Sequence, residues 1–74
     1  MGILDHLVSI SEVLVWQARQ RAHDQRRTLK LLELQGDTEA TRRAEAVLAT
    51  VEHAYRVALY RLKTDCAVRD DQTR

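Results

Sequence analysis

The sequence L-E-L-Q-G-D-T-E at residues 32–39 decides the fold of this 74-residue chain. Gly36 can adopt the left-handed backbone conformation that closes a helix C-terminus. Asp37 or Thr38 can then cap the next helix through a side-chain oxygen. Glu39 follows in the first turn of that helix, where a negative charge suits the helix dipole. Because the connection is so short, the two flanking helices are predicted to be antiparallel neighbours.

The composition on both sides of the turn favours long, uninterrupted helices. Proline is absent, and the two glycines, Gly2 and Gly36, stand where a helix would begin or end. The abundant Ala, Leu, Arg, Glu and Gln residues are good helix formers. We therefore expect an all-α, two-helix antiparallel hairpin that forms a single domain. The predicted bounds are residues 3–35 for the first helix, 35–38 for the turn, 38–68 for the second helix and 69–74 for a frayed tail, all within one domain of residues 1–74.

Each predicted helix carries a series of core residues at helical spacing. In the first helix the steps of the series average about 3.6 residues, and consecutive steps of four act as a local stutter. In the second helix, steps of four and three alternate, which is the pattern of a coiled-coil seam. The predicted series are Ile3, Leu7, Ile10, Leu14, Ala18, Ala22, Gln25, Leu29 and Leu32, followed by Ala44, Leu48, Val51, Tyr55, Ala58 and Leu62.

The apolar faces are wider than one neighbouring helix can cover. Soluble proteins rarely leave such a large apolar patch in water, so a second hairpin is expected to cover it. The sequence thus predicts a homodimer that forms a four-helix bundle. The residues that widen the two faces include Leu4, Val8, Val13, Val47, Ala54 and Leu59.

Charged residues make up 31% of the chain and are interleaved, with a formal net charge of +1. So balanced a charge gives no general bias towards nucleic acid or membrane. Opposite charges also occur at i,i+4 spacing, which supports a helical register. The expected ion pairs of this kind are Glu39–Arg43, Glu52–Arg56, Arg61–Asp65 and Asp65–Arg69.

The apolar run from Ile3 to Trp16 is expected to be a buried amphipathic segment rather than a targeting signal or a membrane span. No basic residue precedes it, and it is shorter than the roughly 20 residues that a span requires. The single cysteine, Cys66, allows no internal disulfide. A lone thiol suits a reducing compartment, so the expected location is the cytoplasm.

Residues 25–63 contain three short motifs, namely L-x-x-Q-G-D-T, A-E-A-V-L-A-T and Y-R-L. This stretch, about half of the chain, resembles short uncharacterised helical-hairpin proteins of alphaproteobacteria. Such proteins have a leucine-ended helix, a Gly-Asp-Thr turn and an Ala-Glu-x-x-Leu helix. The resemblance implies a capped hairpin and brings no activity, cofactor or site residue.

Catalysis and metal binding are not expected. No nucleophile motif or phosphate-binding glycine loop is present, and a two-helix hairpin offers no enclosed pocket. Across the hairpin, His6 should lie near Cys66, and His23 should lie near His53. Each pair supplies two ligands, whereas structural zinc takes four. We therefore expect no enzyme activity, no metal and no cofactor.

Two features are candidate contacts for partners. Trp16 falls opposite the predicted core and is a candidate protein contact, either a second subunit or another protein. A basic segment could contact phosphates, with three of its residues on one side and Arg42 and Arg43 close across the turn. The candidate nucleic-acid contacts are Arg19, Arg21, Arg26, Arg27 and Lys30.

The function that these features favour is a small, non-catalytic, self-associating helical protein that acts in interaction or regulation. The alternative is an RNA- or DNA-binding hairpin dimer of the ROP type that uses residues 19–30. That alternative rests on an analogy of fold, since no residue motif carries over.

Overall fold

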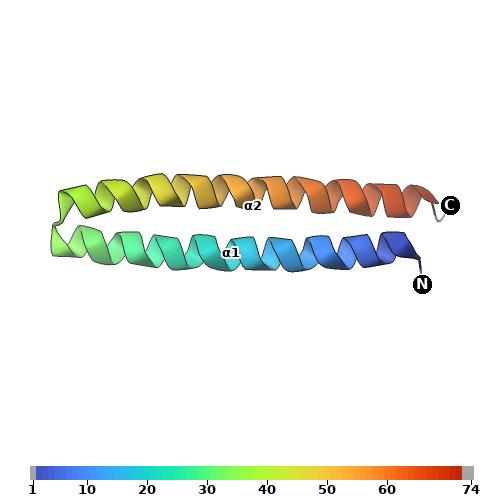
Figure 1. Ribbon diagram of the computed structural model, residues 1–74, viewed down its shortest axis with the longest axis horizontal. Coiled ribbons are helices and arrows are strands. Elements are labelled where there is room, and N and C mark those ends of the chain that lie inside the picture. The colour runs from blue at the N-terminus through green and yellow to red at the C-terminus, as the bar shows by residue number, and fades with distance from the viewer. Residues whose placement is uncertain (1, 73–74) are drawn as a thin grey trace.

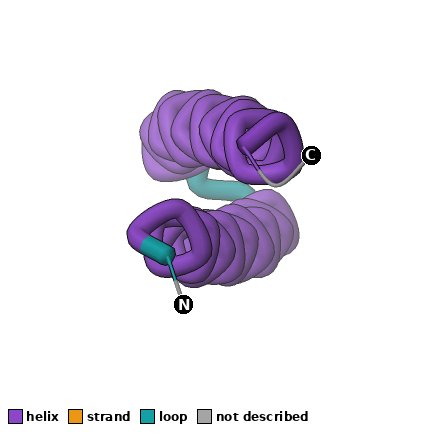
Figure 2. The backbone as a smooth tube through the Cα atoms, turned by 90° about the vertical axis from the view of Figure 1, so that its right-hand side faces the viewer, coloured by secondary structure: helices purple, strands orange, loops and turns teal. Residues whose placement is uncertain are grey.

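A computed structural model of the chain describes residues 2–72. It consists of two helices, α1 (Ile3–Gln35) and α2 (Thr38–Gln72), which lie side by side and run in opposite directions (Figure 1). The molecule is a rod with extents of 56 × 15 × 12 Å, and the start of α1 and the end of α2 lie at the end opposite the turn (Figure 1). The end-on view shows only these two helices in contact (Figure 2). The predicted all-α helical hairpin is confirmed.

The turn between the helices forms as its sequence predicts. Gly36 adopts a left-handed conformation with φ 76° and ψ 14°, and its N–H donates to the carbonyl oxygens of Leu32 and Glu33. These bonds satisfy carbonyl groups at the end of α1 that have no partner within the helix. Of the two candidate caps, Asp37 is the one used, because its Oδ1 accepts a hydrogen bond from the Ala40 N–H at 3.0 Å.

We predict that Asp37→Ala destabilises the hairpin by about 1 kcal/mol, because the Ala40 N–H loses its side-chain acceptor. Asp37→Asn keeps an oxygen in the same place and is the matched control, with a loss below about 0.5 kcal/mol. Urea unfolding followed by circular dichroism measures both values. Equal stability of all three proteins would mean that this cap contributes nothing.

The interface between the helices is a strict heptad seam. The buried and half-buried positions of α1 recur in alternating steps of four and three. Those of α2 contain the same kind of series, with Ala40, Glu52 and Cys66 half-buried beside it. This spacing is that of a left-handed coiled coil. The seam consists of Leu4, Val8, Ser11, Val15, Ala18, Ala22, Gln25, Leu29 and Leu32 from α1, with Thr41, Ala44, Leu48, Val51, Tyr55, Ala58, Leu62, Asp65 and Arg69 from α2.

The predicted seam was wrong in the first half of α1. Leu7, Ile10 and Leu14 are 43%, 44% and 40% exposed, whereas Val8 is 2% exposed. The seam residues there lie one position further along the chain than predicted, and no stutter interrupts the heptads. The predicted series does lie in the seam from Ala18 onward in α1, including Leu29 and Leu32, and all six predicted residues of α2 lie in it, including Leu48, Val51, Tyr55 and Leu62. Leu59 lies beside the seam and is 40% exposed.

The second helix extends further than expected. It continues to Gln72, four residues beyond the predicted end at Val68, so the frayed tail was wrong for residues 69–72. Arg69 occupies a seam position and lies 3.9 Å from Asp5 Oδ1 and 3.5 Å from Asp70 Oδ1. These contacts at the open end of the hairpin explain the extra turn of helix. The last two residues, 73–74, lie outside the described part.

Polar side chains interrupt the apolar seam, and two of them make hydrogen bonds between the helices. Ser11 is 3% exposed, and its Oγ donates a hydrogen bond to the Asp65 carboxylate. Gln25 Nε2 donates to the carbonyl oxygen of Ala44 at 3.2 Å. Buried polar groups cost free energy unless they are paired, so both bonds favour one register of α1 against α2.

The ion pairs differ from those expected from the sequence. Of the four i,i+4 pairs, the structure forms Glu39–Arg43, at 2.6 Å. Glu52 instead binds Arg26 of the other helix at 2.8 Å. Asp65 accepts a hydrogen bond from Ser11, and Arg69 forms ion pairs with Asp5 and Asp70. Several charges that the sequence suggested would pair along one helix therefore pair between the helices.

The core of a single hairpin is thin. Within residues 2–72, five side chains are buried, and three of them are alanines. Small side chains bury little apolar area, so the packing energy of one hairpin is low for its length. These five residues are Val8, Ser11, Ala18, Ala22 and Ala44.

Candidate functional site: the apolar face of the hairpin

The seam divides the remaining surface of the hairpin into two faces. Four residues that each directly precede a seam residue lie on the same side of the seam, where they line a common groove. They are Leu14 and Arg21 of α1 with Ala54 and Arg61 of α2. On the opposite side, the Arg26–Glu52 ion pair joins the two helices. The two faces differ sharply in composition.

We call the side of the hairpin that carries this groove the apolar face. It holds eight of the thirteen large hydrophobic side chains that are exposed in the described chain. The first half of α1 supplies half of them. This is the stripe that the sequence placed in the core, and in the isolated hairpin it faces water. The apolar face consists of Ile3, Leu7, Ile10, Leu14 and Leu31 of α1 with Val47, Val57 and Val68 of α2.

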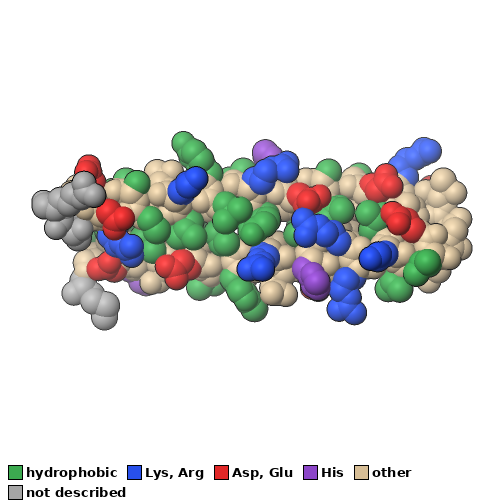
Figure 3. Space-filling view, turned by 180° about the vertical axis from the view of Figure 1, so that it is seen from behind, with side chains coloured by type: hydrophobic (Ala, Val, Ile, Leu, Met, Phe, Trp, Pro, Cys, Tyr) green, Lys and Arg blue, Asp and Glu red, His purple; other side chains and the backbone are tan. Residues whose placement is uncertain are grey.

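The opposite side is a charged face, and Figure 3 shows it. Acidic and basic side chains alternate along both helices there, with apolar side chains visible between them (Figure 3). Opposite charges so close together largely neutralise one another, which leaves no broad field of one sign. The charged face contains Asp5, Glu12, Arg19, Arg26 and Glu33 of α1 with Glu45, Glu52, Leu59 and Cys66 of α2.

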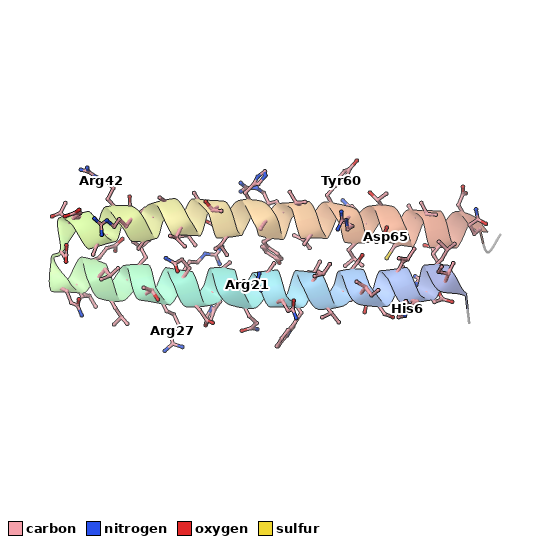
Figure 4. All side chains as sticks on the ribbon, viewed as in Figure 1. His6, Arg21, Arg27, Arg42, Tyr60 and Asp65 are labelled. Carbon is pink, nitrogen blue, oxygen red and sulfur yellow. The ribbon has the colours of Figure 1, made fainter. Side chains whose placement is uncertain are left out.

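The predicted basic segment is divided between different sides of α1. Arg19, Arg26 and Lys30 fall on or beside the charged face, as expected, but Arg26 is engaged by Glu52. Arg21 lines the groove of the apolar face instead. Arg27 projects from the outer side of α1, away from α2 (Figure 4). The segment therefore does not form one continuous cationic surface.

The two arginines expected to extend that surface across the turn do not do so. Arg42 projects from α2 on the side away from α1 (Figure 4). Arg43 is engaged by Glu39. Arg42 therefore does not extend the basic segment, and Arg43 pairs with an acid of its own helix.

Trp16 is 62% exposed, as expected for a residue opposite the core. Its helical position places it at the outer edge of the charged face, away from the apolar face. Val13, Leu34 and Tyr60 also point outward, and Tyr60 projects from α2 in Figure 4. Val13 lines a shallow hollow with Ile10 and Leu14 at the margin of the apolar face, and Tyr60 lines one with Leu59 and Leu62.

The predicted histidine pairs do not build a metal site in the described structure. No cluster of three or more His, Cys, Asp or Glu side chains within residues 2–72 is arranged to hold a metal ion. In addition, neither helix contains, in its described residues, an apolar stretch long enough to cross a membrane.

The sequence interpretation missed two polar features next to the apolar face. One is the buried Ser11–Asp65 hydrogen bond, and the other is the pair of arginines, Arg21 and Arg61, in a single groove. Both follow from the seam register. The strict 4-3 spacing from Leu32 back through Gln25 and Ala18 would have placed Ser11 in the seam.

Comparisons of the chain with protein-family models, with curated proteins and with solved structures found no match. The argument for a function therefore rests on the surfaces of the hairpin itself.

Proposed function

We propose that this protein is a small, non-catalytic interaction or regulatory protein that works as a homodimer, with two hairpins packed through their apolar faces into a four-helix bundle. The observation that carries the proposal is the apolar face itself. It presents Leu7, Ile10 and Leu14 as one continuous stripe, and each is at least 40% exposed in the single hairpin. Burial of such side chains against a second copy stabilises by about 25 cal/mol per Å².

The total surface of the hairpin supports a second copy as the partner. The chain exposes 6039 Å², whereas a compact monomer of the same 8.6 kDa mass would expose about 4,700 Å². The excess of about 1,300 Å² exceeds the roughly 800 Å² that one partner buries in a standard interface. A dimer would bring this elongated chain close to the surface of an ordinary globular protein.

The charged face stays in water in such a dimer and is available to other molecules. Trp16 lies at its edge, which makes it the first candidate for contact with a protein partner. The proposed location is the cytoplasm, where the single Cys66 would remain a thiol. The proposal requires no cofactor, metal or membrane.

Multi-angle light scattering at micromolar concentration tests the proposal. We expect twice the mass of the chain across the whole elution peak. A folded species that keeps the mass of one chain when the protein concentration is raised up to 100-fold would contradict self-association.

The alternative is a nucleic-acid-binding dimer that uses the basic segment 19–30, of which Arg19 and Arg26 lie on the charged face. Neighbouring acids weaken it, because Glu52 already engages Arg26. We predict weak, non-specific binding of short RNA and DNA duplexes that disappears at physiological salt. Five phosphate contacts would lose about 10²–10³-fold in affinity between 50 and 200 mM salt.

Fluorescence anisotropy at those two salt concentrations measures this binding. Wild type is compared with Arg19→Gln/Arg26→Gln/Arg27→Gln, which should remain folded and associated. Tight binding that survives physiological salt and is lost in the triple variant would establish the nucleic-acid function instead.

A further inference from the structure

A groove crosses the middle of the apolar face between the two helices. It has a volume of about 240 Å³, and both helices contribute to it. Apolar and small side chains form most of its walls, and the buried Ser11 lies at its floor. Two arginines, one from each helix, stand at the same groove. The lining residues are Ser11, Leu14, Ala18, Arg21, Ala54, Val57, Ala58 and Arg61.

Neither arginine of this groove has an acidic partner among residues 2–72. The nearest acid along the chain from Arg61 is Asp65, at i,i+4 spacing, and Ser11 holds it in the seam. Asp24 follows Arg21 by three residues and makes no ion pair with it. The folded hairpin thus leaves two positive charges at one groove, although the sequence places an acid within reach of each.

This arrangement suits one kind of ligand. A guanidinium group donates several hydrogen bonds in a fixed planar fork that matches a carboxylate or a phosphate. Leu14, Val57 and the groove alanines offer apolar contact directly beside that charge. We propose that the groove binds an amphipathic anion, with its carboxylate or phosphate group between Arg21 and Arg61 and its hydrocarbon chain along the apolar walls.

The proposal also predicts a link to self-association, and this part rests on the proposed function. A second hairpin that covers the apolar face would take both guanidinium groups out of water. Burial of unpaired charges opposes assembly, whereas a bound anion compensates them. The anion should therefore strengthen the dimer, because by linkage a ligand that prefers the assembled state stabilises it.

Equilibrium dialysis with four probes tests the site: n-octyl phosphate, n-octanoate, inorganic phosphate and n-octanol. Wild type should bind one of the two amphipathic anions, and the comparison of these two identifies the preferred head group. Inorganic phosphate tests the charge alone, and n-octanol tests the chain alone. Both should bind at least about tenfold more weakly, because each lacks half of the interaction.

Two double variants with equal charge changes make the test specific. Arg21→Gln/Arg61→Gln should lose at least about tenfold in affinity for the amphipathic anion. Arg27→Gln/Arg42→Gln removes two arginines that project away from the groove (Figure 4) and should leave the affinity unchanged within twofold. If the first variant does not fold by circular dichroism, Ala54→Glu replaces it, since a carboxylate placed in the groove should block the site.

Sedimentation equilibrium on the same samples separates this inference from the proposed function. A monomeric wild type that binds the anion through Arg21 and Arg61 supports the site and contradicts the dimer. A dimeric wild type that binds none of the probes overturns the site and leaves the dimer standing. Equal binding to wild type and both double variants would also overturn it, as non-specific attraction to a basic surface.

Discussion

Ile10→Asp/Leu14→Asp should abolish self-association and, with it, most of the helical structure. Both side chains lie in the apolar stripe of α1 and are 44% and 40% exposed in one hairpin. In the proposed dimer, four such side chains lose the two-fifths of their surface that is still exposed, and each contributes about 0.6–1.3 kcal/mol on that burial. Four charges in their place should raise the dissociation constant by more than about three orders of magnitude.

Gln20→Asp/Leu34→Asp is the matched control for this change. It introduces two identical charges in α1 at exposed residues that do not line the hollow shared by Ile10 and Leu14. We expect this variant to keep the mass of the dimer and the helix content of wild type. Light scattering and circular dichroism measure both. If the two double variants behaved alike, the apolar face would not be the interface.

A second large effect is expected from Val8→Asp, which should leave the chain unfolded at every concentration. Val8 is 2% exposed and packs in the seam, so a carboxylate there would have no water and no partner. The cost of an unpaired buried charge is about 3–5 kcal/mol or more. That is comparable with the whole stability of about 5 kcal/mol expected for so small a protein.

The single variant Val13→Asp provides the comparison for Val8→Asp. It makes the same substitution in the same helix at a residue that is 53% exposed. Its effect on the free energy of unfolding should remain within about 0.5 kcal/mol, as for surface changes in general. A folded Val8→Asp protein would mean that the seam register described for α1 is incorrect.

Much of the hairpin could be predicted from local chemistry. Gly36 and Asp37 define the turn through backbone conformation and capping, and both effects depend on one or two residues. The seam of α2 could also be predicted, because Leu48, Val51 and Tyr55 continue one regular series of alternating four- and three-residue steps. In these segments a single arrangement satisfies the pattern.

The first half of α1 could not be assigned in the same way. Leu7 and Val8 are adjacent, as are Leu14 and Val15, so two apolar series run in parallel along this segment. In one of the two series, the polar residue Ser11 breaks the run of apolar side chains. In the structure, however, α2 buries Ser11, and its hydroxyl donates a hydrogen bond to Asp65. The choice between the series depends on the other helix, which a pattern within α1 does not contain.

The candidate groove also escaped prediction, and for a related reason. At i,i+4 spacing, Arg61 and Asp65 indicated a local ion pair, and local pairs are worth only a few tenths of a kcal/mol. The hydrogen bond from Ser11 to Asp65 outcompetes that pair in the folded hairpin. Arg61 is then left beside Arg21, a residue 40 positions away in sequence that no local rule connects to it.

Thermal unfolding as a function of concentration tests the central claim, that this chain folds as it self-associates. Circular dichroism would follow the helix signal of wild type from 1 to 100 μM protein. If folding and association are linked, Tm should rise steadily with concentration by several degrees, because mass action favours the associated state. A Tm that is the same across this range, with the mass of a single chain at its upper end, would contradict the account.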